Sequence, residues 1–208
     1  MNILCISDTH GQHRKLKLPK AELLLFAGDM GARSFPQLED FANWLAAIDL
    51  PAERKIIIAG NNDGVFEQQP QEARKYLDGI ATYLENSSCT VDGINIYGTP
   101  VSLAFRNLFF NIPDDGSIQK YWDMIPQNTD ILITHQPPFG ILDSDFRKKH
   151  LGCPRLLTRV KEIKPRLHCF GHIHGAYGVK TTDGTTFVNA SVCNDFMKIS
   201  NKAMLLQQ

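Results

Sequence analysis

The sequence has no surplus of charge of either sign. Its 208 residues include 22 Lys and Arg and 22 Asp and Glu, which gives a formal net charge of zero. Proteins that bind nucleic acid non-specifically normally carry a basic excess, because contacts to phosphates supply their affinity. We therefore expect no nucleic-acid polymer as a partner. A small anionic substrate stays compatible with neutrality, since bound cations would supply their own field.

Cysteines and long apolar runs are scarce as well. The chain has five cysteines, an odd number without a CxxC pair, so a disulfide framework is not expected. The apolar run at residues 3–6 is interrupted by Asp8 and follows no basic segment, unlike a secretion signal. No stretch approaches the ~18 consecutive apolar residues of a membrane span. These absences predict a cytoplasmic protein without a membrane partner.

The length and the hydrophobic content set the expected size of the fold. With 208 residues, 43% of them hydrophobic, the chain is long enough for one well-packed core and short for two. Repeats, low-complexity tracts and linkers are missing. We therefore expect a single domain over residues 1–208. The sequence gives no indication of an oligomeric state.

Short apolar runs alternate with amphipathic stretches along the chain. The runs are typical of strands covered on both faces; they lie at residues 3–6, 23–26, 56–59, 94–97, 131–134 and 167–170. Helical spacing of apolar residues, with Ser or Pro near the starts, predicts four helices; they lie near residues 34–48, 70–77, 118–125 and 156–163. For residues 34–48, Ser34 and Gln37 form a capping-box pattern.

Two Asp-Gly pairs lie between β-prone residues, at 92–93 and 183–184. Each predicts a β-hairpin. Because strands alternate with helices early and pair by hairpins late, the sequence predicts an α/β fold with a partly antiparallel sheet.

Polar residues able to bind metal follow five of the six predicted strands. Ligands in open α/β sheets gather outside the carboxyl ends of the strands, so these residues should converge. Two pairs, Asp8 with His10 and His172 with His174, are spaced so that an extended backbone points both side chains the same way. The candidate ligands are Asp8, His10, Asp29, Asn61, His135, His172 and His174.

This set exceeds what one metal ion needs. A structural zinc ion takes four ligands, whereas seven ligands divide well between two ions if one carboxylate bridges them. Mixed histidine and carboxylate ligation suits Mn, Fe, Zn or Co better than Ca. Any one of these residues alone would be an ordinary turn, surface or core residue; the ordered set predicts a site for two divalent ions.

Five motifs, taken in order, resemble those of the calcineurin-like metallophosphoesterases. They are Asp8-Thr-His10, Gly28-Asp29, Gly60-Asn61, Thr134-His135 and residues 171–174 (Gly-His-Ile-His). The segments 134–138 and 98–111 are most similar to the small metallophosphoesterase-domain-containing phosphodiesterases. The resemblance implies a four-layer fold of two packed mixed sheets flanked by helices. It also implies that Asp8, His10 and His174 hold one metal, that Asn61, His135 and His172 hold the other, and that Asp29 bridges them.

The expected chemistry is hydrolysis by water. Two cations about 3.5–4 Å apart generate hydroxide near neutral pH and stabilise the charge that develops on a phosphoester during in-line attack. The substrate class is a small phosphoester, with nucleotide-like or small organic diesters first. A phosphomonoesterase or a protein phosphatase is the alternative within the same chemistry.

One position departs from the family pattern. Asn62 stands where the family usually has a histidine that helps the leaving alkoxide depart, and Asp63 keeps the place of the residue that usually steadies this histidine. Asn62 can donate a hydrogen bond but cannot serve as a general acid, whose loss costs about 10²–10⁴ in rate. The leaving group could be acidic enough to need no proton, or another residue such as His13 could substitute. Alternatively, the chain is a weakly active or non-catalytic metal-binding scaffold.

Overall fold

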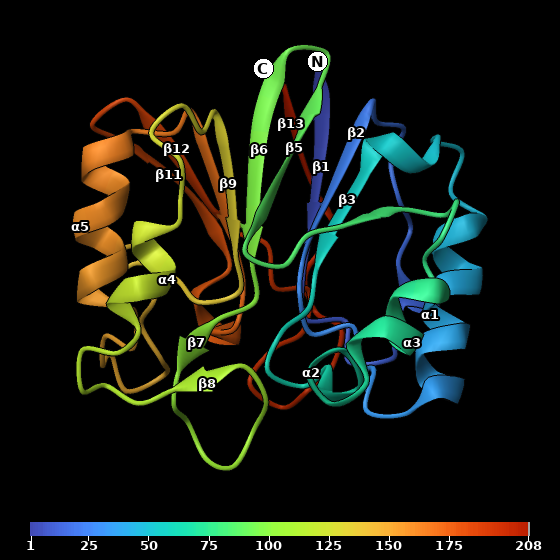
Figure 1. Ribbon diagram of the computed structural model, residues 1–208, viewed down its shortest axis with the longest axis horizontal. Helices are drawn as coiled ribbons and strands as arrows, with labels where there is room; N and C mark the ends of the chain where they lie inside the picture. The colour runs from blue at the N-terminus through green and yellow to red at the C-terminus, as the bar shows by residue number, and fades with distance from the viewer. Residues whose placement is uncertain (208) are drawn as a thin grey trace.

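The computed structural model describes residues 1–207, which form two large sheets packed face to face with helices on their outer sides (Figure 1). The first sheet has the order β13-β1-β2-β3-β4, in which the last four strands are parallel and β13 is antiparallel to β1. Its strands are β1 (Asn2–Ile6), β2 (Leu23–Ala27), β3 (Lys55–Ile58), β4 (Thr82–Tyr83) and β13 (Met204–Gln207).

The second sheet has the order β11-β12-β10-β9-β6-β5, with four parallel strands in the middle and an antiparallel strand at each edge. Its strands are β5 (Ser87–Val91), β6 (Ile94–Thr99), β9 (Ile131–Thr134), β10 (Leu167–Phe170), β11 (Gly178–Thr182) and β12 (Thr185–Asn189). A small separate pair consists of β7 (Ser102–Leu103) and β8 (Asn111–Ile112).

The helices cover the two outer faces. Helix α1 (Phe35–Ala46) and the short α2 (Gly64–Gln68) and α3 (Pro70–Lys75) lie on the side of the first sheet, and α4 (Gln119–Asp123) and α5 (Pro154–Ile163) lie on the side of the second (Figure 1). Short 3-10 turns occupy His13–Lys15, Ala52–Arg54 and His174–Ala176. The predicted α/β class, with two packed mixed sheets between helices, is confirmed.

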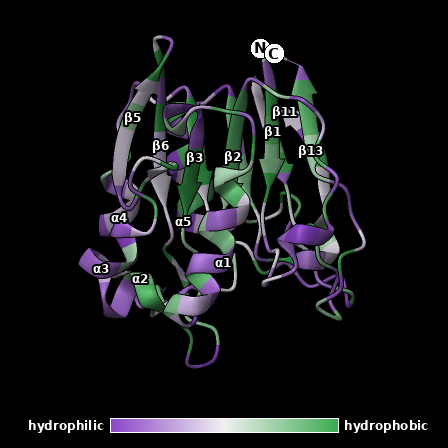
Figure 2. Ribbon diagram, turned by 90° about the vertical axis from the view of Figure 1, so that its right-hand side faces the viewer, coloured by the Kyte–Doolittle hydropathy of each residue, from purple (hydrophilic) through white to green (hydrophobic). Residues whose placement is uncertain are grey.

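Both faces of the central strands are buried, which explains their unbroken apolar runs. In β1, Ile3 and Cys5 point into the layer between the sheets, whereas Leu4 and Ile6 point toward α1. Figure 2 shows the same hydrophobic character along β1, β2 and β3. A third apolar cluster, which includes Trp122 and Phe170, packs α4 and α5 against the second sheet. The strands are therefore held rigidly, and their carboxyl ends are fixed relative to one another.

Both predicted hairpins are present, as β5–β6 and β11–β12. Their turns place Asp92 and Gly93 at φ 50° and 79°, and Asp183 and Gly184 at φ 52° and 83°. Two successive positive φ values are the signature of the type I′ turn, whose twist matches that of the flanking strands.

The start of α1 differs from the predicted capping box. Ser34 is the N-cap residue, but its side chain bonds no backbone N–H of the helix. Instead, Gln37 Oε1 accepts from the Arg33 backbone N–H at 3.1 Å and from Ser34 Oγ at 3.2 Å. Gln37 thus reaches one residue further back than a capping box requires, and fixes the loop that leads from β2 into α1.

Among residues 1–207, we find no helix with the length and apolar character needed to cross a bilayer.

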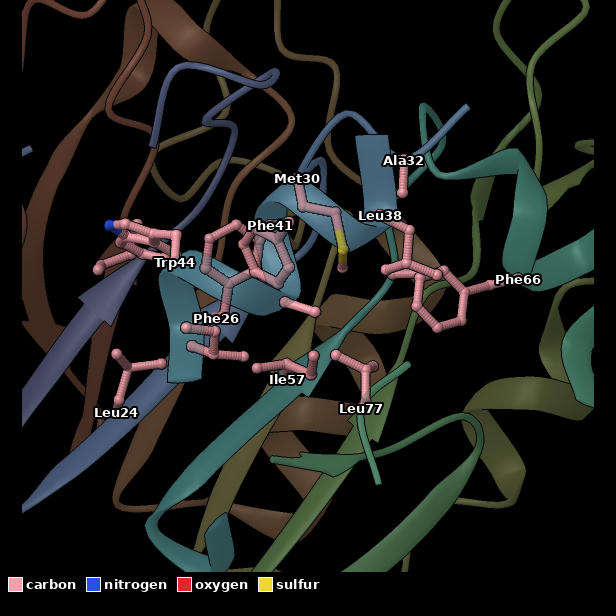
Figure 3. Packing of buried hydrophobic residues seen from close by; sticks show 14 of the residues in the cluster. Leu24, Phe26, Met30, Ala32, Leu38, Phe41, Trp44, Ile57, Phe66 and Leu77 are labelled. Atoms are coloured by element: carbon pink, nitrogen blue, oxygen red, sulfur yellow. The ribbon is translucent and has the colours of Figure 1, made fainter. Parts of the chain in front are cut away.

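The aromatic cluster under α1 generates a stability prediction. Phe41 is fully buried, and its ring packs edge-on against Phe26 with centroids 4.9 Å apart and beside Trp44 at 5.5 Å (Figure 3). Phe41→Ala should lower the free energy of unfolding by about 3–5 kcal/mol, because the packed residues around it cannot move to fill the cavity that it leaves. Urea unfolding measures this loss. The exposed Phe146→Ala should change it by less than about 0.5 kcal/mol, and equal losses in the two variants would contradict this packing.

Candidate metal centre

The parallel strands of both sheets end on the same side of the molecule, the lower side in Figure 1. The loops that leave these ends carry all of the predicted ligands, and the structure brings them together. In chain order, the seven follow β1, β2, β3, β9 and β10; they are Asp8, His10, Asp29, Asn61, His135, His172 and His174.

The first group of donors consists of Asp8, His10 and His174. His10 Nε2 lies 3.1 Å from His174 Nε2, and His174 Nε2 lies 3.4 Å from Asp8 Oδ1. The donor atoms of all three residues lie within 4.8 Å of one another. They form one corner of the cluster, at the ends of β1 and β10.

The second group surrounds His135 Nε2. This atom lies 3.1 Å from Asn61 Oδ1, 3.2 Å from His172 Nδ1 and 3.4 Å from Asp29 Oδ1. The other oxygen of Asp29, Oδ2, lies 3.7 Å from His10 Nε2 in the first group. Asp29 therefore presents one carboxylate oxygen to each group, an arrangement that suits a bridging ligand.

Asp8 also reaches further than the family resemblance implies. Its carboxylate lies with Asp29 and His135 in a second set of donor atoms within 4.8 Å of one another. Asp8 is fully buried and accepts hydrogen bonds from Ser7 Oγ at 2.6 Å and from the His172 backbone N–H at 3.0 Å. It thus faces both groups and not the first group alone.

The donor set fits metal ions rather than a hydrogen-bond network. Donors bound at 2.0–2.2 Å to one ion lie about 3.0–3.5 Å apart in tetrahedral or octahedral geometry, close to the separations found here. Two imidazole nitrogens facing each other, as in His10 and His174, can share at most one proton. Imidazole, carboxylate and amide oxygen together suit Mn, Fe, Zn or Co.

Two histidines are oriented by backbone carbonyls. His135 Nδ1 donates to Ala27 O at 2.9 Å, and His174 Nδ1 donates to Asn194 O at 3.1 Å. Each bond places a proton on Nδ1, so that in the neutral ring the Nε2 lone pair faces the cluster. Such outer partners fix the tautomer that a metal requires.

The charges of the cluster shift its pKa values strongly. Burial opposes the charged form of Asp8, but the hydrogen bond and charge of His174 outweigh it and hold the pKa of Asp8 below its ordinary value. Burial likewise opposes the charged form of His174, and Asp8 overcomes it, raising the pKa of His174 to about 9. Burial, with the nearby His135, lowers the pKa of His172 to about 4. A cation would therefore displace a proton from His174 and find the His172 lone pair free.

The backbone is strained where the ligands lie. Asp8, His10, Asp29 and His172 have φ values of 56°, 44°, 58° and 69°, a region that non-glycine residues seldom occupy. Backbone hydrogen bonds from Asp8 N to Gly28 O at 2.9 Å and from His10 N to Asp29 O at 3.0 Å hold two of these residues in place. Strain of this kind, maintained by its surroundings, is typical of functional sites.

Two glycines leave room for the carboxylates. A Cβ on Gly60 would collide with Asp29 Oδ1, and a Cβ on Gly171 would collide with Asp8 Oδ2. The absence of a side chain at these positions lets the backbone of neighbouring strand ends approach the carboxylates closely.

Of the candidate catalytic residues, Asp63 links two loops of the site by hydrogen bonds. Its buried carboxylate accepts backbone N–H bonds from Gly31 at 2.8 Å, Gly60 at 2.8 Å, Ala32 at 2.9 Å and Met30 at 3.2 Å. It therefore joins the loop that carries Asp29 to the loop that carries Asn61. Burial and the charge of Asp29 raise its pKa to about 7.

Asn62 lies against the bridging carboxylate. Its backbone N–H donates to Asp29 Oδ1 and its side-chain amide donates to Asp29 Oδ2, both at 2.7 Å.

His13, in contrast, packs in the aromatic cluster under α1. Its Nε2 lies 3.0 Å from an Asp40 oxygen, and its ring contacts Phe41 and Trp44. None of these contacts joins His13 to the donor groups.

Sequence reasoning missed Arg33. Its guanidinium donates to the side-chain oxygen of Asn62, which places a permanent positive charge beside the bridging carboxylate. Arg33 lies four residues after Asp29 on the loop that follows β2. The position of an arginine on a ligand-bearing loop was the available signal.

Known proteins match this chain over most of its length. The family model for calcineurin-like phosphoesterases matches residues 1–176. Human metallophosphoesterase domain-containing protein 1 is 38% identical over 215 residues, which cover 91% of this chain and 65% of the human protein. UPF0046 protein K07C11.7 of Caenorhabditis elegans is 33% identical over 221 residues, covering 99% of this chain and 74% of the worm protein. The chain thus spans about two thirds of the length of the human relative.

Solved structures show the same fold at low identity. Phosphopantetheinyl hydrolase from Mycobacterium tuberculosis superimposes with a TM-score of 0.59 at 15% identity, covering 94% of this chain and 90% of that one. The protein TT1561 of Thermus thermophilus gives a TM-score of 0.60 at 13% identity, covering 90% of this chain and 88% of that one.

The tie made by Asp63 can be tested on the metal-free protein. Asp63→Asn should lower the free energy of unfolding by about 2–3 kcal/mol, because an amide cannot accept from all four N–H groups and turns its own N–H₂ toward some of them. Urea unfolding in chelator, at a pH below the raised pKa of Asp63, measures the loss, because above that pKa the buried charge of the wild-type carboxylate itself lowers stability. The control is Asp145→Asn, whose carboxylate accepts from Arg147 N at 2.8 Å and Lys149 N at 2.9 Å on a surface loop. A loss in Asp63→Asn no larger than in this control would contradict the tie.

Proposed function

This chain belongs to the calcineurin-like phosphoesterase family, and we propose that it hydrolyses a small phosphodiester with two divalent metal ions. The gathering of seven donor residues in two groups, with one oxygen of Asp29 facing each group, carries this proposal. Nucleotide-like or small organic diesters are the favoured substrates. Phosphomonoesters and phosphoproteins would use the same chemistry.

The residues would divide between the ions as the two groups do. Asp8, His10 and His174 would hold one ion, Asn61, His135 and His172 would hold the other, and Asp29 would bridge. Mn, Fe, Zn or Co suits this mixture of ligands. When bound, the pair would activate a water molecule and neutralise negative charge on the phosphoester.

Arg33, positioned by Asn62, would stabilise the leaving oxygen. Asn62 is fixed by its two bonds to Asp29, and the guanidinium of Arg33 is fixed on Asn62. Arginine does not give up its proton near neutral pH, so this pair provides positive charge and hydrogen bonds but no acid. Stabilisation of a developing anion without protonation suits esters whose leaving group is already acidic, such as a phenolate or a phosphate.

A non-catalytic scaffold is the competing function, because Asn62 replaces a proton donor. The oriented histidines support metal binding in either case, so turnover is the property that distinguishes the two functions. His135 and His174 have their outer nitrogens bonded to backbone carbonyls, an arrangement that serves a metal and contributes little to a protein-binding surface.

The direct test is metal-dependent turnover. The chelator-treated protein should bind two Mn²⁺ ions per chain and then hydrolyse bis-nitrophenyl phosphate faster than mononitrophenyl phosphate. Asp29→Asn should reduce turnover at least about 10²-fold, because it removes the charge shared by both ions. Asp145→Asn is the matched control and should keep full activity. Turnover that survives both the chelator and Asp29→Asn would refute the proposal, and metal binding without turnover would favour the scaffold.

The absence of an acid at position 62 leads to a second test. Asn62→His should raise turnover of alkyl phosphodiesters more than that of aryl phosphodiesters, by up to about 10²-fold, because only an alkoxide needs a proton to leave. Arg33→Met removes positive charge without changing proton donation, so it should slow both classes. Steady-state rates on matched alkyl and aryl esters measure these effects. An equal gain on both classes in Asn62→His would count against a missing acid.

A further inference from the structure

The loop at residues 194–198 is a tight turn built on one asparagine. Asn194 N donates to Lys198 O at 2.9 Å, and Met197 N donates to Asn194 O at 2.8 Å. The Asn194 side-chain oxygen accepts from Phe196 N at 3.0 Å and from Lys198 N at 3.2 Å. Four hydrogen bonds within five residues hold this loop in one shape.

Phe196 stands at the tip of this loop with its side chain in solvent. It is 82% exposed, more than any other large hydrophobic residue in the described part of the chain. Exposing an aromatic ring forfeits the free energy that burial would provide. A ring held outward by an ordered loop is free to stack on the flat ring of a ligand, as aromatic side chains stack on bases.

Both ends of the loop are bonded to the segments that carry the first donor group. Asn194 O accepts from His174 Nδ1 at 3.1 Å, and Met197 O accepts from Gln12 Nε2 at 2.8 Å. Gln12 lies two residues after His10. Because neighbouring Cα atoms are about 3.8 Å apart, the Cα of Phe196 lies within about 8 Å of that of Asn194. Phe196 is therefore two residues away from the residue that orients His174.

A positive charge lies on the same side of the cluster. Lys15 Nζ donates to Gln12 Oε1 at 2.9 Å, so its ammonium group is held next to the residue that anchors the loop. The same ammonium group is close enough to Cys193, the residue before Asn194, to oppose the rise that burial causes in the pKa of that thiol. A lysine bonded to the residue that anchors the loop suits a ligand that joins a flat ring to an anion.

We propose that Phe196 stacks on the aromatic ring of the phosphoester while its phosphate lies at the donor cluster. Substrates with a nucleobase or an aryl group are therefore preferred over purely aliphatic ones. This inference rests on the proposed function, since it assigns the substrate class of the same site. Phe196 acts in binding and takes no part in the chemical step.

The chain offers a matched control in Phe146. This ring is 74% exposed, and the guanidinium carbon of Arg147 lies 5.1 Å from its centroid. The described hydrogen bonds of residues 143–150 stay within residues 140–152, so none joins this loop to the donor groups. Phe146→Ala therefore removes an exposed ring of the same size without disturbing the anchored loop.

The experiment compares anions that differ only by a ring. Calorimetric dissociation constants are measured on the Mn²⁺-loaded protein for adenosine monophosphate against ribose phosphate, and for phenylphosphonate against methylphosphonate. Phe196→Ala should weaken binding of the ring-bearing member of at least one pair about tenfold, and change the ring-free members less than about twofold. The pair that responds identifies the ring as nucleobase or aryl. Phe196→Trp should restore binding, and Phe146→Ala should leave all four constants unchanged.

Three results would overturn the inference. They are equal binding of both members of each pair by the wild-type protein, an equal loss for all four anions in Phe196→Ala, and an equal loss in Phe146→Ala. Failure of the proposed function is visible separately, because a protein that binds these anions without hydrolysing any ester fails in turnover and still reports on Phe196.

Discussion

The structure depends on one carboxylate, that of Asp29, which lies between two groups of metal-binding side chains. Its oxygens face His10 on one side and His135 on the other. Asn62 donates to both oxygens, and Asp63 ties the loop of Asp29 to the loop after β3. The buried carboxylates of Asp8, Asp29 and Asp63 lie close together, and burying several negative charges is costly in free energy unless cations compensate them. The two packed sheets and their helices hold this carboxylate in position.

This arrangement works because parallel strands end together. Apolar residues on both faces of β1, β2, β3, β9 and β10 lock the two sheets between helices, so the strand ends cannot drift apart. The loops that follow then carry residues more than 160 positions apart in the chain to within 3.1 Å, as for His10 and His174. Strained backbone at Asp8, His10, Asp29 and His172 is tolerated on a scaffold of this rigidity.

Much of this arrangement was predictable from local sequence. Unbroken apolar runs identified the central strands, Asp-Gly pairs identified both hairpins, and the position of each polar motif after a strand predicted the donor cluster. What escaped prediction depends on contacts between distant segments. There are three examples: the pairing of β13 with β1, the four backbone amides that bond Asp63, and the contact of Arg33 with Asn62. In each case the local sequence does not identify the partner residue. His13 illustrates the same limit, since only the packing of α1 shows that its ring joins an aromatic cluster.

The most direct test of this account is anomalous X-ray scattering from a crystal of the Mn²⁺-loaded protein. We expect two peaks on either side of the Asp29 carboxylate, one among Asp8, His10 and His174 and the other among Asn61, His135 and His172. The separation should be about 3.5–4 Å, as in other two-metal sites. A single peak, or none at Asp29, would contradict the central claim that these side chains form one site for a pair of cations.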